Sequence, residues 1–156
     1  MKKPLSFVLI LTGLFIFGCS KLNDNPPDYV KDGAAYKEGI EGLMIYFILA
    51  DASGAMTTSE GKVSLTISEA HSKWFSWSFE FIETELYSMS FNVKKTDFRK
   101  AKMGIGASER EVILCPIGRI VYSSFSRKPS EMTGKVKMIF QRPDGRILKG
   151  EERVFF

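Results

Sequence analysis

The sequence has little of the chemistry on which most catalytic and metal sites depend. Its 156 residues include one histidine and two cysteines. A zinc site needs several nitrogen or sulfur ligands at a suitable spacing, which His71 and one cysteine in an apolar run do not supply. No Gly-x-Ser-x-Gly segment surrounds a serine, and no glycine-rich phosphate-binding loop opens a helix. We therefore expect a protein that is not an enzyme and that holds no metal.

The chain also has only a small excess of positive over negative charge. The chain has 22 Lys and Arg residues against 18 Asp and Glu residues, which gives a net charge of +4. Two of the cations are Lys2 and Lys3, in a segment that we expect to be removed. The remaining charge of +2 is too weak to indicate a nucleic-acid partner. The content of 44% hydrophobic residues, 6 Pro and 13 Gly is typical of one globular domain rather than of a low-complexity chain.

The chain has no apolar run long enough for a membrane-spanning helix. The longest begins at Leu5 and ends at Phe17, and only Ser6, Thr12 and Gly13 interrupt it. A spanning helix needs about 20 apolar residues. A shorter run that follows two lysines is typical of a secretory signal peptide.

The end of this run carries a more specific pattern. Ile16-Phe17-Gly18-Cys19 gives an aliphatic residue, a variable residue, a small residue and a cysteine. In this the chain resembles bacterial lipoproteins, although Phe17 is larger than the residue usual at its position. The resemblance implies that the Cys19 thiol carries a diacylglycerol and that the chain is cut before Cys19. An ordinary signal peptide and a short uncleaved anchor are the alternatives.

The lipoprotein resemblance also implies a location. Two or more acyl chains hold a protein firmly on a membrane. We therefore expect a cell-envelope protein whose only attached group is the lipid on Cys19. Ser20 follows the cysteine where an aspartate favours retention in the inner membrane. The outer membrane is thus favoured in an organism that has one.

We divide the chain into three parts on composition. Residues 1–18 form the signal peptide, residues 19–38 the lipidated cysteine and a flexible tether, and residues 39–156 the folded domain. The tether prediction depends on polar residues and on the pair Pro26-Pro27. Such a tether has a reach on the order of 20–25 Å.

The folded part alternates apolar and polar residues with a period of two, which is typical of β-strands. Pro116 interrupts one such segment and predicts a bulge, a bend or an edge position there. We interpret Glu83–Glu85 as a turn between two strands. About seven strands are expected, in 43–49, 63–67, 75–81, 87–93, 112–122, 136–140 and 148–156. This pattern predicts an antiparallel two-sheet sandwich and resembles the immunoglobulin-like fold, although a small barrel would fit it too.

Three groups of reactive side chains have structural interpretations that we favour. Cys115 lies in an apolar run, so we expect a buried thiol rather than a nucleophile or an intermolecular disulfide. His71 is expected in a polar loop, although a Ser–His–acid triad is formally possible. The glutamates Glu80, Glu83 and Glu85 are expected at a hairpin tip, where solvation is more common than a glycosidase-type acid pair.

Two features are candidates for binding. Trp74 has the opposite strand parity to Phe75 and Phe79, so it is expected to face outward and could stack on a sugar or anchor a protein. A covered strand-end residue is the alternative. A basic stretch could meet an acidic partner, lipid headgroups or an anionic polysaccharide, or could simply be a solvated edge. Its candidate binding residues are Lys94, Lys95, Phe98 and Arg99.

These observations favour a non-enzymatic envelope lipoprotein whose sandwich binds another envelope component, most simply a protein. A carbohydrate-binding sandwich that uses Trp74 is the second hypothesis. An enzyme that uses His71 or the glutamates is the third. The fold class alone does not choose among them.

Overall fold

The computed structural model describes residues 23–38, 41–75, 78–104 and 108–156. The side chains of all these residues are described except those of 34–38 and 72–81. The signal peptide and Cys19 therefore lie outside the described residues. Within the described part no helix is long and apolar enough to cross a membrane. The strands are β1 (Tyr29–Glu38), β2 (Gly42–Ala50), β3 (Met56–Thr57), β4 (Gly61–Phe75), β5 (Ser78–Val93), β6 (Arg99–Met103), β7 (Arg110–Val121), β8 (Thr133–Gln141) and β9 (Ile147–Phe155). Two single-turn 3₁₀ helices are η1 (Lys95–Asp97) and η3 (Tyr122–Ser124).

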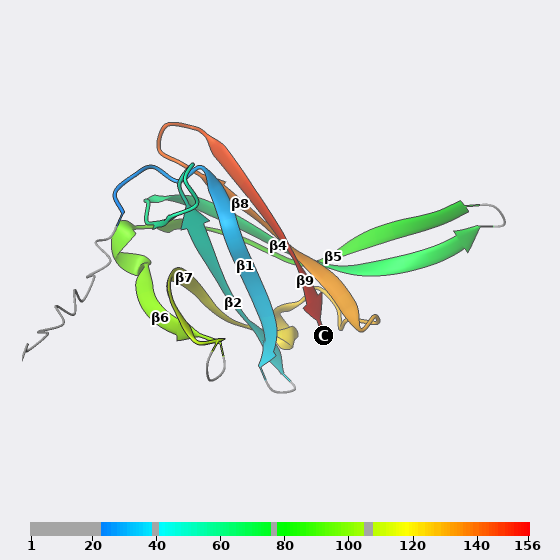
Figure 1. The fold of residues 1–156 in the computed structure, drawn as a ribbon. Helices are drawn as coiled ribbons and strands as arrows, with labels where there is room; N and C mark the ends of the chain where they lie inside the picture. Colours follow the sequence, from blue (N-terminus) through cyan, green and yellow to red (C-terminus); the bar gives the residue numbers. More distant parts are fainter. Residues whose placement is uncertain (1–22, 39–40, 76–77, 105–107) are drawn as a thin grey trace, which may run out of the picture.

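The strands form two antiparallel sheets (Figure 1). One has the order β1-β2-β7-β6, with the short β3 also paired to β2, and the other has the order β5-β4-β8-β9. With β3 set aside, these orders correspond to the ABED and C′CFG sheets of the immunoglobulin fold. The predicted sandwich is thus confirmed.

The core lies between the sheets and is built from alternate residues of each strand. Phe47 of β2 is fully buried at its centre. Its ring centroid lies 5.6 Å from that of Phe98, edge to face, and 6.0 Å from that of Phe140. Burial of each such side chain contributes about 1.5–3 kcal/mol. Because Phe98 is a core residue, it does not contribute to a binding surface with the basic residues around it.

The irregularity expected at Pro116 is present. The register of β2 with β7 shifts between Ile45, which pairs with Gly118, and Tyr46, which pairs with Pro116. Ile117 is left without a partner residue, as in a β-bulge. Gly118 has a φ of +108°, a conformation that few other residues adopt.

The predicted turn at Glu83–Glu85 is wrong, and so is the single strand predicted over 75–81, because β4 ends at Phe75 and β5 begins at Ser78 as its antiparallel partner. β4 and β5 form one long hairpin in which Glu83 pairs with Ala70 and Glu85 pairs with Ser68. The alternation changes parity here because Leu86 is an extra, bulged residue whose side chain is 1% exposed. A bulge and a turn both break alternation, and the polar residues made the break resemble a turn.

The predicted tether is also too long. Residues 29–38 form β1, which pairs with β2 from Tyr29–Ala50 to Glu38–Gly42. Edge strands often carry polar residues because these discourage pairing with other chains, and such a strand resembles a linker in composition.

A buried carboxylate fixes the chain even before β1. The side-chain amides of Asn23 and Asn25 donate to Asp51 Oδ2 at 2.7 and 2.9 Å. Asp51 Oδ1 accepts from the backbone amides of Ser53 and Ala55 and from the Ser53 hydroxyl. The Asp51 side chain therefore connects the start of the described chain to the turn after β2.

This arrangement predicts a pH-dependent contribution of Asp51 to stability. Hydrogen bonds from Ser53, Asn25 and Asn23 hold the pKa of Asp51 well below its usual value. Its stabilisation is therefore fully present above the unfolded pKa, roughly 4, and is lost as the pH falls toward the folded pKa. We expect Asp51→Asn to lower the urea midpoint at neutral pH and to differ less from the wild type as the pH falls below about 4.

The control for this comparison is Asp24→Asn. The Asp24 side chain is 87% exposed and lies 3.8 Å from the Lys95 ammonium, so its loss should change little. A wild-type advantage over Asp51→Asn that stayed constant through the acid range would show that the ionised form of Asp51 does not stabilise the fold.

Candidate functional site: a projecting ribbon and its base

One hairpin extends well beyond the rest of the sandwich. β8 pairs with β4 only as far as Glu69, which lies opposite Gly134. Residues 70–75 of β4 therefore pair only with residues 78–83 of β5 among the described strands. We call these two segments the ribbon. In Figure 1 the ribbon projects from one end of the molecule, and the N-terminal segment and β6 lie at the other.

The ribbon is rich in aromatic residues, and its long edges have no described partner strand. Its register pairs Trp74 with Phe79 and Ser72 with Phe81. A two-stranded hairpin alone is marginally stable in water. Unpaired strand edges also present backbone N–H and C=O groups that another chain can pair with. The parity argument for Trp74 is wrong with respect to Phe79, because the two residues lie in different strands and are direct partners, so they share one face of the ladder. The outward orientation itself concerns a side chain outside the described ones, and it stays a prediction.

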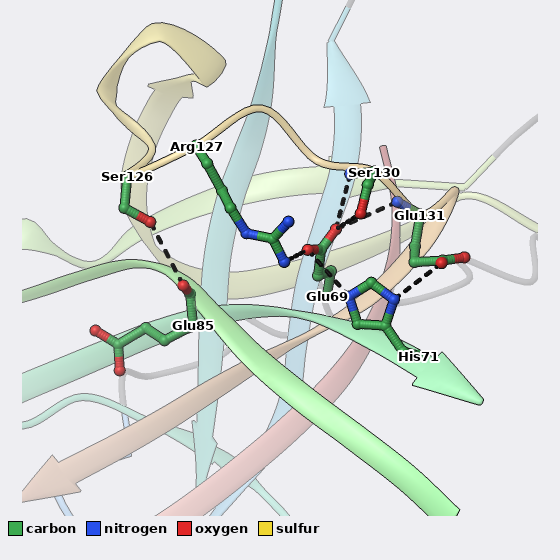
Figure 2. Close-up of polar contacts among 7 residues, drawn as sticks. All are labelled: Glu69, His71, Glu85, Ser126, Arg127, Ser130 and Glu131. Carbon is green, nitrogen blue, oxygen red and sulfur yellow. Dashed lines mark hydrogen bonds and ion pairs between the residues drawn. The ribbon is translucent and has the colours of Figure 1, made fainter. Parts of the chain in front are cut away.

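The base of the ribbon contains a fully buried carboxylate, Glu69 (Figure 2). Its Oε2 accepts from the backbone amides of Ser130 at 2.8 Å and Glu131 at 3.2 Å, and from the Ser130 hydroxyl at 3.2 Å. Its Oε1 forms an ion pair with Arg127 and lies 3.1 Å from His71 Nε2. A buried charge is tolerated when it is paired and hydrogen-bonded in this way.

The loop of residues 126–131 therefore crosses the ribbon at its base. His71 Nδ1 lies 2.9 Å from Glu131 Oε1, so the imidazole bridges two carboxylates. The Ser126 amide donates to the Leu86 carbonyl at 2.7 Å, which attaches the same loop to β5. The expectation that His71 lies in a polar loop is wrong, because it is in β4 opposite Ile82. These contacts fix the direction in which the ribbon leaves the sandwich.

The other strand of the ribbon is held by surface ion pairs. Glu83 contacts Lys137 and lies 3.0 Å from Lys135. Hydrogen bonds from Lys137 and then Lys135 lower the pKa of Glu83. The three glutamates expected at a hairpin tip are instead spread along β5. Glu80 pairs with Lys73 within the ribbon, Glu83 lies at its base, and Glu85 lies on the sandwich side of that base.

A pocket of about 930 Å³ adjoins the ribbon base. Its floor contains the rings of Tyr122, Phe125 and Phe156, whose centroids lie 5.4–6.3 Å apart in edge-to-face contacts. Burial raises the pKa of Tyr122, and its hydroxyl has no hydrogen-bond partner in the described part of the chain. Because Ser130 and Glu131 line the pocket as well as binding Glu69, the carboxylate also shapes the pocket wall.

The basic candidates lie away from the ribbon. Lys94, Lys95 and Arg99 are exposed on η1 and at the start of β6. Lys95 is close to Asp24 of the N-terminal segment. The structure thus brings the basic residues to the N-terminal end and leaves Trp74 at the opposite end (Figure 1).

Cys115 is a core residue, as expected. Its side chain is 1% exposed, and burial, together with the charge of Asp97, raises the pKa of its thiol to about 12.

Sequence reasoning missed Glu69, yet the sequence contained a signal for it. Val63, Leu65 and Ile67 are the buried positions of β4, and Glu69 continues the same parity. A carboxylate at a core-facing position requires nearby donors.

Comparisons with protein-family models, curated proteins and solved structures found no match.

We expect Glu69→Gln to loosen both the ribbon base and the loop of residues 126–131. A glutamine carries no charge to pair with Arg127. Its NH₂ group would also face an N–H donor at a place where a carboxylate oxygen of Glu69 accepts a hydrogen bond. The Glu69 carboxylate is fully buried but the Arg127 side chain is 44% exposed, so loss of the hydrogen bonds to the carboxylate should cost about 1.5–3 kcal/mol. Glu83→Gln at the exposed ion pair should cost about 1 kcal/mol or less. Urea unfolding and hydrogen exchange of residues 126–131 would measure the two effects. Equal effects of the two substitutions would contradict the role given to Glu69.

The buried thiol gives a second prediction. In a Cys19→Ser variant, Cys115 is the sole cysteine. We expect no reaction with a thiol reagent at about pH 8 in the folded protein and complete reaction in denaturant, because the reagent attacks an exposed thiolate. Rapid reaction of the folded protein would place Cys115 at the surface.

Proposed function

We propose that the protein is a lipid-anchored, non-enzymatic binding module of the cell envelope that engages a partner protein through the ribbon. The observation that carries the proposal is the ribbon itself. It is an aromatic-rich hairpin that continues beyond the end of β8, and its edges have no partner strand among the described residues.

Strand addition is the recognition mode that this geometry suits. An extended segment of a partner can pair with a free edge, and its main-chain hydrogen bonds supply affinity while side chains supply specificity. Aromatic residues such as Trp74 and Phe79 are also the residue types enriched at the centres of protein interfaces.

The fixed base makes the ribbon suitable for binding. Glu69 and Arg127 hold the loop of residues 126–131 across β4, and Ser126 holds it to β5. A segment that is already oriented before binding loses less entropy on association. The buried carboxylate of Glu69 thus supports affinity without contacting the partner.

The lipid on Cys19 explains why the partner is an envelope component. An anchored module meets only molecules that reach the same membrane surface, and anchoring raises its local concentration there. A weak interface is sufficient under these conditions.

A glycan ligand is the second candidate. Trp74 and Phe79 are cross-strand partners, so two aromatic residues lie together at the outer part of the ribbon. Aromatic rings stack on sugar faces. Retention on envelope glycan that is lost in Trp74→Ala, with no protein captured, would favour this ligand over a protein.

A photoreactive amino acid in place of Phe79 tests the proposal in intact cells. We expect it to crosslink to a defined protein. The matched control places the same group at Ile147, which is 54% exposed on β9 and outside the ribbon, and should capture no defined partner.

A shortened ribbon is the complementary variant. Residues 72–81 are replaced by Asn-Gly, which connects His71 to its direct partner Ile82. The replacement removes four residue pairs, from Ser72–Phe81 to Phe75–Ser78, so the ladder parity is unchanged and a two-residue turn fits. We expect an intact fold and loss of the partner. Partner capture by the correctly folded short form would refute the role of the ribbon.

A further inference from the structure

The structure leaves very little chain between the lipid and the folded domain. Asn23 is already held by Asp51, and it forms an isolated parallel bridge with Thr57. Cys19 is four residues upstream in the sequence. Four residues span at most about 14 Å when fully extended. The domain therefore cannot move far from the membrane surface on which the lipid is held.

We propose that the anchor pole lies against the lipid headgroups of the membrane that holds Cys19, so that the ribbon points away from that membrane. The anchor pole comprises residues 23–25, the turn of residues 51–55, and η1. This inference rests on the lipid anchor of the proposed function, and it adds an orientation and a second contact surface.

Several contacts prevent the N-terminal segment from swinging away from the sandwich. The Thr57 hydroxyl lies 2.8 Å from the Asn23 carbonyl and 2.6 Å from that of Asn25. The Asp28 amide donates to the Ala50 carbonyl at 2.7 Å, and the Asp28 carboxylate lies 2.5 Å from Arg146. Release of the segment would break these contacts and those to Asp51 together.

Two exposed lysines at the anchor pole, Lys95 of η1 and its N-cap Lys94, can reach lipid phosphates, although the exposed carboxylates of Asp24 and Asp97 leave the pole without a net positive charge. Lys94 and Lys95 are exposed beside the N-terminal segment, and Lys95 lies near Asp24. Lysine side chains place their ammonium groups at the level of lipid phosphates and lie along the apolar boundary with their carbon stems. These two cations therefore meet phosphate groups where the short link holds the pole down.

The opposite end of the sandwich lies too far away to contact the same surface. Arg142, just after β8, donates to the Pro27 carbonyl next to the anchor pole, whereas Met132 precedes the other end of β8. The length of β8 separates these ends by about 26 Å. The ribbon begins next to Glu69, which pairs with Gly134 at the Met132 end of β8, and it projects away from the sandwich (Figure 1).

The full-length lipidated protein in vesicles tests the orientation. The vesicles contain phosphatidylcholine and phosphatidylglycerol, with or without a lipid that carries a nitroxide at its headgroup. A fluorescent dye is placed on Lys95→Cys or, as the matched control, on Met132→Cys, which replaces an exposed side chain at the far end. Cys115 is buried and takes no dye.

We expect the nitroxide to quench most of the fluorescence at position 95 and little at position 132. The chain has two tryptophans, Trp74 in the ribbon and Trp77 three residues further along the sequence, and their emission provides an unlabelled readout. They should also remain unquenched. Equal quenching at both dye positions, or quenching of the tryptophans, would overturn the proposed orientation.

Asp51→Ala connects the orientation to the contacts that produce it. Loss of the carboxylate should free the N-terminal segment, lengthen the link and reduce quenching at position 95, and unchanged quenching would overturn the mechanism. Flotation of the vesicles separates two failures. A chain that does not float with them lacks the lipid anchor, which defeats the proposed function as well. A chain that floats but quenches equally defeats the orientation alone.

Discussion

The buried carboxylate of Glu69 is the constraint on which much of this structure depends. It occupies a core-facing position of β4, where an unpaired charge would cost several kcal/mol. The loop of residues 126–131 supplies Arg127 and two backbone amides to it, and must therefore cross the sheet at that point. The same crossing fixes the direction of the ribbon and forms one wall of the pocket. A single buried group thus couples the core to the surface that we propose for binding.

Asp51 has the corresponding role at the other end of the sandwich. It also satisfies its charge with donors, and two of them, Asn23 and Asn25, come from the segment that follows the expected lipid site. The two carboxylates therefore define a molecule with fixed ends, one that we propose lies close to the membrane and one that presents the ribbon. A rigid spacer of this kind holds a binding element at a set height above a membrane, which a flexible tether would not do.

The alternation of the sequence was sufficient to predict the sandwich and several of its strands, because strand parity is a local property. It failed where tertiary structure decides. The bulge at Leu86 reverses the parity of β5, so this one strand was interpreted as parts of two strands with a turn at Glu83–Glu85. The length of the ribbon is set by the point at which β8 stops pairing with β4. That point depends on the sequence of β8 and not on the sequences of β4 and β5. Glu69 and Ser130 are 61 positions apart, so their contact was not visible in any local pattern.

The central claim is that the ribbon is covered by a partner in the cell envelope. Hydrogen exchange of the backbone amides of residues 78–83, compared between envelope preparations and the purified protein, tests it most directly. The alternate amides of this segment that point out from its free edge exchange rapidly unless another strand or surface covers them, whereas the others are bonded to β4. The account predicts slow exchange in the envelope and fast exchange after purification, whereas fast exchange in both preparations would contradict it.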